Sequence, residues 1–186
     1  MAKKSTRNTR GRIVSAAWKL FYEQGYEDTT VEEIIELSGT SKGSFYHYFD
    51  GKDALLSTLS SLFDEKYEEL TGLLTPEMTA MEQLLFLNRE LFHMIEDSIS
   101  LDLLARLYST QLTTNGEKHL LDHNRIYYKL LRKIIAKGQA EGQLSSRSNV
   151  NEMVKLYALC ERALLYDWCL CAGEYALTEY SAKVLP

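Results

Sequence analysis

Residues 41–47 read SKGSFYH and gather short polar, basic and aromatic side chains on one predicted helix. Hydroxyl, ammonium and imidazole groups on an exposed helix can hydrogen-bond to base edges and phosphate oxygens of DNA. The predicted roles are base reading for Lys42 and Ser44, and hydrogen bonds to phosphates or contacts with bases for Tyr46 and His47. Gly43 lets a backbone approach closely. This segment therefore suits DNA recognition.

Two short helices joined by a tight turn must hold this segment in place. Thr30 followed by Glu33 forms a capping box that opens the first helix, which Gly39 ends. Ser41 is the predicted N-cap of the second helix. Apolar residues at helical spacing predict a buried face that locks the two helices together, and these are Val31, Ile34, Ile35, Phe45, Tyr48 and Phe49.

A preceding helix over residues 9–24 completes a three-helix unit, because its apolar residues recur on one stripe before the stop signal at Gly25. Residues 1–8 are predicted to be a mobile basic arm. The net charge of the chain is −5, but residues 1–52 carry +1 and residues 53–186 carry −6. The acidic excess thus lies away from the predicted DNA-reading part.

The amides at helix starts add a second mode of DNA contact, since helix N-termini attract phosphates. Thr30, Ser41 and Lys52 lie at or beside three such starts. Together with the exposed helix, this arrangement predicts a helix-turn-helix in which one helix braces the other in the major groove. An ordinary three-helix packing unit without a ligand is the alternative.

The stretch resembles the TetR family of bacterial transcriptional regulators. The resemblance rests on FYEQGYEDTT, TTVEEIIELSG, KGSFYHYF and KDALL, and it covers residues 9–56. It implies DNA contacts at Thr30, Ser41, Lys42, Gly43, Ser44, Tyr46, His47 and Lys52. Thr40 stands where the family usually has a small aliphatic residue, and Ile35 stands where many members have Ala. Both departures can shift the angle of the reading helix.

The rest of the chain is predicted to be helical throughout, which makes the fold class all-α. We expect a helix from residue 51 to about residue 74, then a break at Pro76. The later predicted helices span residues 77–96, 101–112, 118–141 and 150–172, followed by a short final segment. The predicted domains are an N-terminal helix-turn-helix DNA-binding domain (1–52) and a C-terminal helical bundle for effector binding and dimerisation (53–186).

The resemblance implies a ligand-responsive homodimer that represses transcription from a palindromic double-stranded DNA operator. Two reading heads about one DNA turn apart, roughly 34–36 Å, would double the contacts that one small motif makes. A small-molecule effector would release the operator. Candidate residues of the effector cavity are Tyr67, Met78, Phe86, Phe92, Met94, Tyr108, Tyr127 and Tyr128. Aromatic and Met residues at this spacing can also be plain core.

The predicted dimer surface lies on the last long helix. Its residues at helical spacing are Val154, Tyr157, Glu161, Leu164, Leu165 and Trp168. They would form half of a four-helix interface with the segment after Gly173, which is short for this role. The alternative is that this stripe is internal core.

Other functional classes are less favoured by the sequence. His119 and His123 are four residues apart and could bind a metal on one helix face, which leaves a metal sensor as an alternative, as is a helical small-molecule-binding protein. We find no glycine-rich phosphate loop, nucleophile elbow or paired-carboxylate motif, so we predict neither an enzyme nor a cofactor. Three cysteines without paired spacing, and no long apolar run, predict a cytoplasmic protein without a membrane span.

Overall fold

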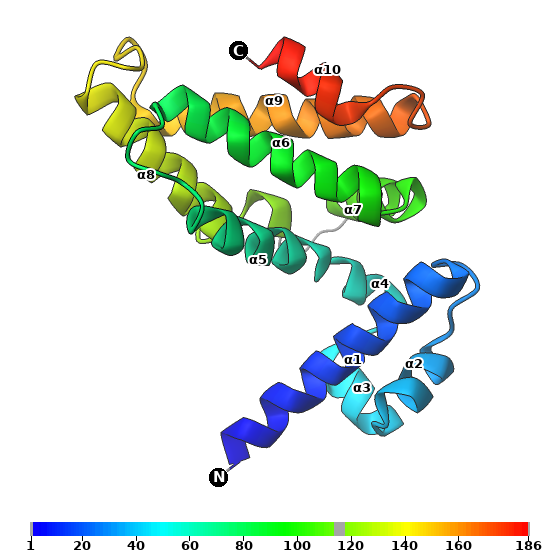
Figure 1. The fold of residues 1–186 in the computed structure, drawn as a ribbon. Helices are drawn as coiled ribbons and strands as arrows, with labels where there is room; N and C mark the ends of the chain where they lie inside the picture. Colours follow the sequence, from blue (N-terminus) through cyan, green and yellow to red (C-terminus); the bar gives the residue numbers. More distant parts are fainter. Residues whose placement is uncertain (1, 114–117, 186) are drawn as a thin grey trace. The chain divides into compact units, whose positions relative to one another are not determined.

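The computed structural model describes the backbone of residues 2–113 and 118–185, and the side chains of residues 9–113 and 118–185. The described residues form helices and no strand, which confirms the all-α prediction (Figure 1). The elements are α1 (Ala2–Gln24), α2 (Val31–Ser38), α3 (Lys42–Tyr48), α4 (Lys52–Leu56), α5 (Leu59–Thr71), α6 (Ala80–Ser98), α7 (Leu101–Thr113), η1 (His119–Leu121), α8 (Ile126–Ala140), α9 (Val150–Leu170) and α10 (Leu177–Val184).

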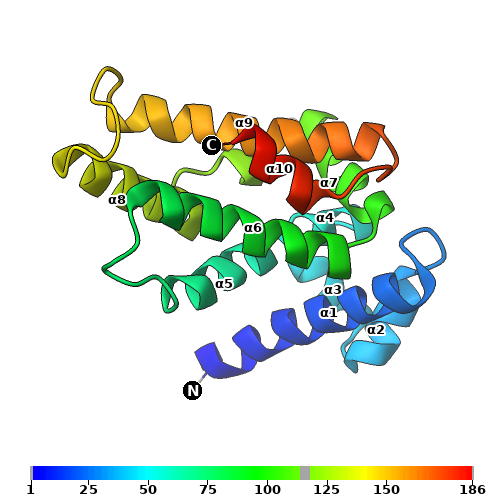
Figure 2. The same cartoon turned by 45° about the horizontal axis from the view of Figure 1, so that its top comes forward.

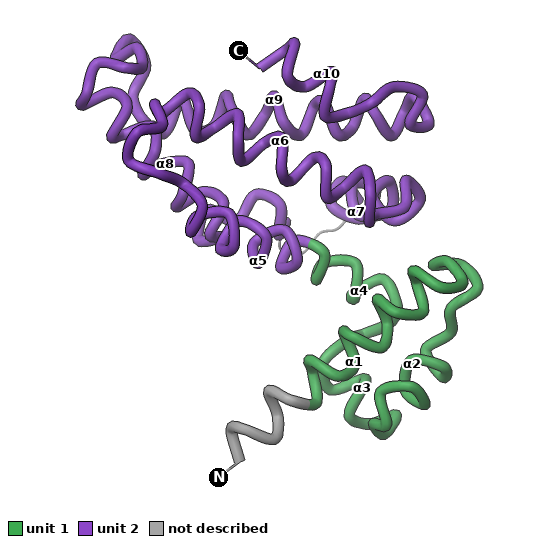
Figure 3. The backbone as a smooth tube through the Cα atoms, in the orientation of Figure 1, with its two compact units in different colours: residues 1–59 green, residues 60–186 purple. Residues whose placement is uncertain are grey.

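The chain divides into two compact units, residues 1–59 and residues 60–186 (Figure 3). The sequence placed the domain boundary earlier, after residue 52. The difference is α4, which belongs with unit 1. None of the described helices is long and apolar enough to cross a membrane.

Unit 1 is built around α1. The side chains of Ile13 and Ala17 on α1, Ile34 on α2 and Phe45 on α3 are fully buried and form its core. The ring of Phe45 also packs against that of Phe49, with 5.9 Å between the centroids. The apolar spacing that predicts these helices thus also brings them together. The predicted basic arm, residues 1–8, lies outside the residues whose side chains are described, although α1 begins at Ala2.

The single helix predicted over residues 51–74 is wrong, because the structure breaks it between α4 and α5. The Thr58 hydroxyl donates a 2.6 Å hydrogen bond to the Leu55 carbonyl and accepts one of 2.8 Å from the Trp18 indole. The Ser57 hydroxyl donates to the Ala54 carbonyl at 2.7 Å. Hydroxyls bonded to nearby backbone compete with the helical ladder, which explains the break.

Unit 2 is a bundle in which α8 and α9 pack against each other, α6 packs on α8, and α10 lies across α6 and α9 (Figure 2). The Glu96 carboxylate of α6 accepts hydrogen bonds from the amides of Leu177 and Thr178, at 2.6 and 3.0 Å. A side chain of α6 therefore caps the N-terminus of α10 and fixes this crossing.

Two helix starts in unit 2 differ from the predicted ones. Helix α6 begins after Thr79, whose capping box with Glu82 sets the start three residues later than residue 77. The helix predicted over residues 118–141 is interrupted, since only η1 and α8 are helical there. The Asp122 carboxylate accepts a 2.8 Å hydrogen bond from the Asn124 amide and forms a turn between them.

The stripe predicted as the dimer surface on α9 lies in the interior of the chain instead. Tyr157 is half-buried, and the other five residues are at most 6% exposed: Val154, Glu161, Leu164, Leu165 and Trp168. Helix α9 carries two apolar stripes, and only one of them can face the core of its own chain. The apolar spacing alone could not say which one does. These residues cannot meet a second copy while they are covered by their own bundle.

Candidate functional site

The exposed face of α3 gathers most of the predicted DNA-contacting residues. Ser41, Lys42, Gly43, Tyr46 and His47 are exposed and Ser44 is half-buried. The Ser41 hydroxyl accepts a 3.1 Å hydrogen bond from the Ser44 amide and so acts as the predicted N-cap. The buried Phe45 and Phe49 anchor the opposite face of this helix. Packing therefore presents these side chains together to solvent.

The space beside the Gly43 backbone is nearly empty within the described part of the chain. A Cβ built there meets, within the described part of the chain, only the Ser41 hydroxyl, at 4.0 Å. Neither packing nor a positive φ requires glycine at this position. The backbone at Gly43 is therefore accessible from outside the chain.

The Lys42 ammonium is engaged by its own unit in the absence of DNA. It lies 3.4 Å from the Glu32 carboxylate of α2 and 6.0 Å from the centroid of the Tyr46 ring. Both partners of this ion pair are exposed, so the pair is screened by water and contributes little to stability. A phosphate can therefore compete for this ammonium at a small energetic cost.

The start of α2 shows the predicted capping box. The Thr30 hydroxyl accepts a 3.2 Å hydrogen bond from the Glu33 amide, and the Glu33 carboxylate accepts one of 2.7 Å from the Thr30 amide. The backbone and side-chain hydrogen bonds from Thr30 lower the pKa of the Glu33 carboxyl. Thr30 stays exposed beside α3, where it was predicted to contact DNA.

The turn between α2 and α3 is held by contacts that the sequence analysis missed. Gly39 adopts a left-handed conformation with φ of 59°. The Arg12 guanidinium of α1 donates hydrogen bonds to the carbonyls of Ser38 and Gly39, the first at 2.9 Å. Thr40 departs from the family pattern, and its hydroxyl forms a 2.8 Å hydrogen bond with the Ser38 hydroxyl. Arg12 thus closes the C-terminus of α2 and sets where α3 begins.

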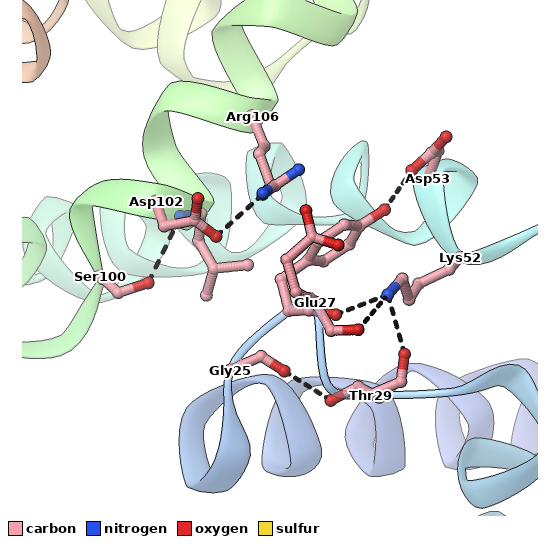
Figure 4. Close-up of polar contacts among 10 residues, drawn as sticks. Gly25, Glu27, Thr29, Lys52, Asp53, Ser100, Asp102 and Arg106 are labelled. Carbon is pink, nitrogen blue, oxygen red and sulfur yellow. Dashed lines mark hydrogen bonds and ion pairs between the residues drawn. The ribbon is translucent and has the colours of Figure 1, made fainter.

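Lys52 faces its own backbone, although it was predicted to contact DNA (Figure 4). Its ammonium donates hydrogen bonds to the carbonyls of Tyr26, Glu27 and Thr29, at 2.6, 3.2 and 2.8 Å. It also lies 4.3 Å from the centroid of the Tyr26 ring, whose hydroxyl donates to Asp53. An ammonium has three hydrogens, so these three carbonyls can satisfy it completely. Lys52 fastens the loop between α1 and α2.

Unit 2 holds a second candidate site, a small hollow of about 50 Å³ in its core. Four of the eight predicted cavity residues line it: Tyr67, Phe92, Tyr108 and Tyr127. Met78 and Phe86 line a separate groove of about 590 Å³ between α6 and α10. Tyr128 and Met94 line neither of these two hollows.

Glu161 is the unexpected member of the inner hollow. Sequence periodicity placed it in the dimer stripe, but its carboxyl is buried and lines the hollow. It accepts hydrogen bonds from the Asn88 amide at 2.8 Å and from the Tyr127 hydroxyl at 2.5 Å. Burial raises the pKa of the Glu161 carboxyl, and the hydrogen bonds offset this in part. A charged residue within an apolar helical stripe was the only available signal in the sequence.

The other charged groups of the hollow lie nearer its edge. The Arg125 guanidinium forms a bidentate ion pair with Asp64, with both hydrogen bonds at 3.0 Å, and also donates to the Ser60 carbonyl. The Arg162 guanidinium donates a 3.0 Å hydrogen bond to the Tyr128 hydroxyl. Arg162 also lines a neighbouring groove of about 490 Å³.

The two histidines of the metal-sensor alternative are not on one helix. His119 opens η1, whereas His123 follows it in the turn before α8. The His123 ring instead packs against Tyr128, with 4.7 Å between centroids. Among the described residues, no group of three or more His, Cys, Asp or Glu side chains could hold a metal ion.

The comparisons with known proteins match this geometry. Residues 13–59 match the sequence model of a family described as bacterial regulatory proteins, tetR family. The QacR transcriptional regulator of Staphylococcus aureus is 36% identical over 62 residues, which are 33% of this chain and 33% of that protein. The YvdT regulator of Bacillus subtilis is 26% identical over 147 residues, which cover 78% of this chain and 75% of that one.

Similarity over the whole chain is structural. The solved structure of Thermus thermophilus FadR, a TetR family repressor in complex with lauroyl-CoA, superposes with a TM-score of 0.78 and 25% identity. The superposition covers 95% of this chain and 91% of that one. Curated relatives above 30% identity, in contrast, are matched over about a third of their length or less. The detailed sequence similarity is therefore concentrated in unit 1.

Proposed function

We propose that this chain, which belongs to the tetR family of bacterial regulatory proteins, is a dimeric DNA-binding repressor that a small-molecule effector releases from its operator. The observation that carries the proposal is the exposed face of α3, which collects hydrogen-bonding side chains on a helix anchored by Phe45 and Phe49. The separate hollow in unit 2 supplies a place for the effector.

The α3 face supports DNA reading through two kinds of contact. Lys42 and Ser44 lie at the N-terminal end of the helix, where recognition helices contact base edges. Tyr46 and His47 carry groups that bond to phosphates, and Thr30 is exposed at the start of α2. We leave Lys52 out of the contacting set, because its ammonium is satisfied within unit 1.

A second stripe on α9 supports a homodimer. The residues of this outward stripe are Leu156, Leu159, Ala163, Tyr166 and Leu170, all exposed. They are spaced three and four residues apart in alternation, which is the seam that two packed helices share. The same stripe on two copies is self-complementary about a two-fold axis, and a two-fold axis suits a palindromic operator.

An effector acts through the affinity difference between two states. It shifts the repressor away from the operator only if it binds the released arrangement of the reading heads better than the bound one. Thermus thermophilus FadR, which shares this fold, is a repressor solved with lauroyl-CoA. We infer that unit 2 of this chain is likewise the effector-binding part.

The test is DNA binding by the purified full chain to the region upstream of its own coding sequence. We expect salt-sensitive binding in about the nanomolar range. Lys42→Ala and Tyr46→Ala should each weaken specific binding while leaving the fold and the dimer unchanged. Lys19→Ala and Tyr22→Ala are matched controls, because both residues are exposed in unit 1 outside α3.

Two outcomes would contradict the proposal. If the α3 variants bind as tightly as the controls, α3 is not the reading helix. If the unaltered chain shows no shift even at low salt, the protein is better described as a helical small-molecule-binding protein with an unused motif.

A further inference from the structure

The core of unit 2 contains a carboxyl group that has no ion-pair partner among the described residues. Glu161 on α9 is 5% exposed, and its hydrogen-bond donors come from neutral residues, Asn88 on α6 and Tyr127 on α8. Within the described residues, no Lys, Arg or His forms an ion pair with it. Burying an unpaired carboxylate is costly, so such groups are retained for a reason other than stability.

Aromatic rings surround this carboxyl. The rings of Tyr67 and Tyr127 lie 5.1 Å apart, and both line the hollow with Glu161. The faces of aromatic rings carry negative potential and attract organic cations. A buried carboxyl beside tyrosine rings therefore has the chemistry that recognises an amine or a quaternary ammonium group.

The remaining charges near the hollow do not cancel this preference. Arg125 is neutralised by Asp64. Arg162 favours the charged form of Glu161, but it is the smallest of the effects on the pKa of that carboxyl, and Arg162 itself is only half-buried. The titratable and charged groups that line the hollow with Glu161 or act on its charge are Tyr67 of α5, Tyr108 of α7, Arg125 and Tyr127 at α8, and Tyr157 and Arg162 of α9. Asp64 acts on the neighbouring Tyr67, and Cys160 acts on the neighbouring Tyr157.

We propose that the effector is an apolar organic cation whose positive charge lies against Glu161 inside this hollow. The inference rests on the proposed function, in that it names the chemical class of the effector. In the empty protein, burial favours the protonated form of the Glu161 carboxyl. Binding of the cation releases that proton to solvent, so the carboxylate and the ligand neutralise each other and the buried charge stays the same.

Burial and hydrogen bonding act on the Glu161 carboxyl in opposite directions. Burial raises its pKa and favours the protonated form, and this is the larger effect. The hydrogen bonds from Tyr127 and Asn88 favour the charged form and offset part of it. The Tyr157 hydroxyl donates its one hydrogen to the Leu84 carbonyl, at 2.8 Å.

The hollow must enlarge to take such a ligand. Its volume of about 50 Å³ is far below the ~300 Å³ at which ligand pockets usually begin. Tyr108, Leu120 and Arg162 line both this hollow and the neighbouring groove of about 490 Å³, so they form the wall between them. Rotation of these side chains would extend the hollow toward the groove and admit an apolar tail. Leu159, Ala163 and Tyr166 of the outward stripe also line the groove, so the tail would lie beside the proposed dimer seam.

The experiment compares three ligands with the same ten-carbon tail and different charge: decyltrimethylammonium, decanol and decanoate. Calorimetric titration of the full chain should give the cation at least ~10-fold tighter binding than the other two, equivalent to about 1.4 kcal/mol. Titration in buffers of different ionisation enthalpy should show a proton released only with the cation. Its affinity should rise with pH, because proton release is then favoured.

A substitution of the buried carboxyl tests its role directly. Glu161→Gln copies the protonated side chain, so it should keep the fold but lose the preference for the cation and the proton release. Glu65→Gln, which alters an exposed carboxyl on α5 outside the hollow, should keep both. If decanoate or lauroyl-CoA binds most tightly and Arg162→Gln abolishes that binding, the effector is an anion and the proposal is wrong.

The wild-type ligand series decides the question even if Glu161→Gln fails to fold. Equal affinities for the three decyl ligands, or cation binding that releases no proton, would also overturn the proposal. Operator binding by the ligand-free protein is measured separately. A chain that binds its operator but prefers no cation refutes only the effector class, whereas a chain that binds no operator refutes the proposed function itself.

Discussion

The Asn88 amide donates a 2.8 Å hydrogen bond to the Glu161 carboxyl and so joins α6 to α9 across the core of unit 2. The Tyr127 hydroxyl adds α8 to the same carboxyl. One buried group thus connects three helices of the bundle. Its protonation state affects both the stability of unit 2 and the ligand that the hollow accepts.

Replacing Glu161 with Gln should remove a pH dependence of stability. Burial raises the pKa of this carboxyl in the folded chain above its ordinary value of 4.5. Above pH 4.5 the unfolded chain releases this proton while the folded chain keeps it, so the folded state binds more protons. The free energy of unfolding contributed by Glu161 therefore falls as pH rises from 4.5 to the raised pKa.

Urea unfolding from pH 4.5 to 8 checks this prediction. The stability of Glu161→Gln relative to the wild type should increase with pH across that window. Glu65→Gln, which alters an exposed carboxyl on α5, should run parallel to the wild type. A Glu161→Gln curve parallel to the wild type would mean that the buried carboxyl titrates as it does in the unfolded chain.

Local signals account for the parts of the fold that the sequence predicted well. Thr30 and Glu33 of the first capping box are three residues apart, so the box is visible in the sequence without tertiary information. The box of Thr79 with Glu82 has the same spacing and could have placed the start of α6. The box of Asn149 with Glu152 opens α9, whose start at Val150 is the predicted one. Ser41 and Gly39 likewise mark α3 by local chemistry.

Contacts between distant residues account for what the sequence could not predict. The break before α5 involves the Trp18 indole, 40 residues from Thr58. The ammonium of Lys52 is drawn inward by carbonyls up to 26 residues away. Glu161 meets Asn88 across 73 residues, and helical spacing alone could not say whether its stripe faces the core of unit 2 or a second copy.

Substituting Gly43 with Ala should weaken operator binding without harming the fold. A methyl group there meets only the Ser41 hydroxyl, at 4.0 Å, among the described residues. Alanine is favoured over glycine in helices by up to ~1 kcal/mol, so the melting temperature should stay the same or rise slightly. The added methyl group stands where DNA approaches, and fluorescence anisotropy should show a loss of affinity of ~10-fold or more, since a backbone contact is blocked.

Ala at Gly11 is the matched control for this substitution. A Cβ at Gly11 meets nothing within 4 Å among the described residues, so it tests the effect of a helical Gly→Ala change away from α3. Equal operator affinity for the two variants would show that α3 does not lie close to the DNA backbone.

The salt dependence of operator affinity distinguishes the role of Lys52 from that of Lys42. Lys52→Ala removes three hydrogen bonds from an ammonium to backbone carbonyls and should lower the free energy of unfolding of unit 1 by about 2–3 kcal/mol. Its effect on operator binding should be indirect, so the slope of log affinity against log salt should not change. Lys42→Ala should reduce that slope by about 1, because it removes a positive charge that neutralises DNA phosphate and so releases counterions.

Urea unfolding and binding titrations between about 50 and 200 mM salt measure these two effects. Lys52→Ala with wild-type stability and a slope reduced by about 1 would instead place its ammonium on a phosphate.

Replacing Leu159 with Glu should dissociate the dimer. Leu159 is 53% exposed within one chain and lies on the outward stripe of α9, between Leu156 and Ala163. In a two-fold seam each chain would place a carboxylate against its copy, and both like-charge repulsion and lost apolar burial oppose pairing. Because the side chain is exposed in the monomer, the fold of unit 2 should survive.

Sedimentation equilibrium should show a monomer, and operator affinity should fall because one reading head alone makes half of the contacts. Leu73→Glu is the control, since Leu73 is 57% exposed outside the stripe. If Leu159→Glu stays dimeric, the two copies meet through another surface.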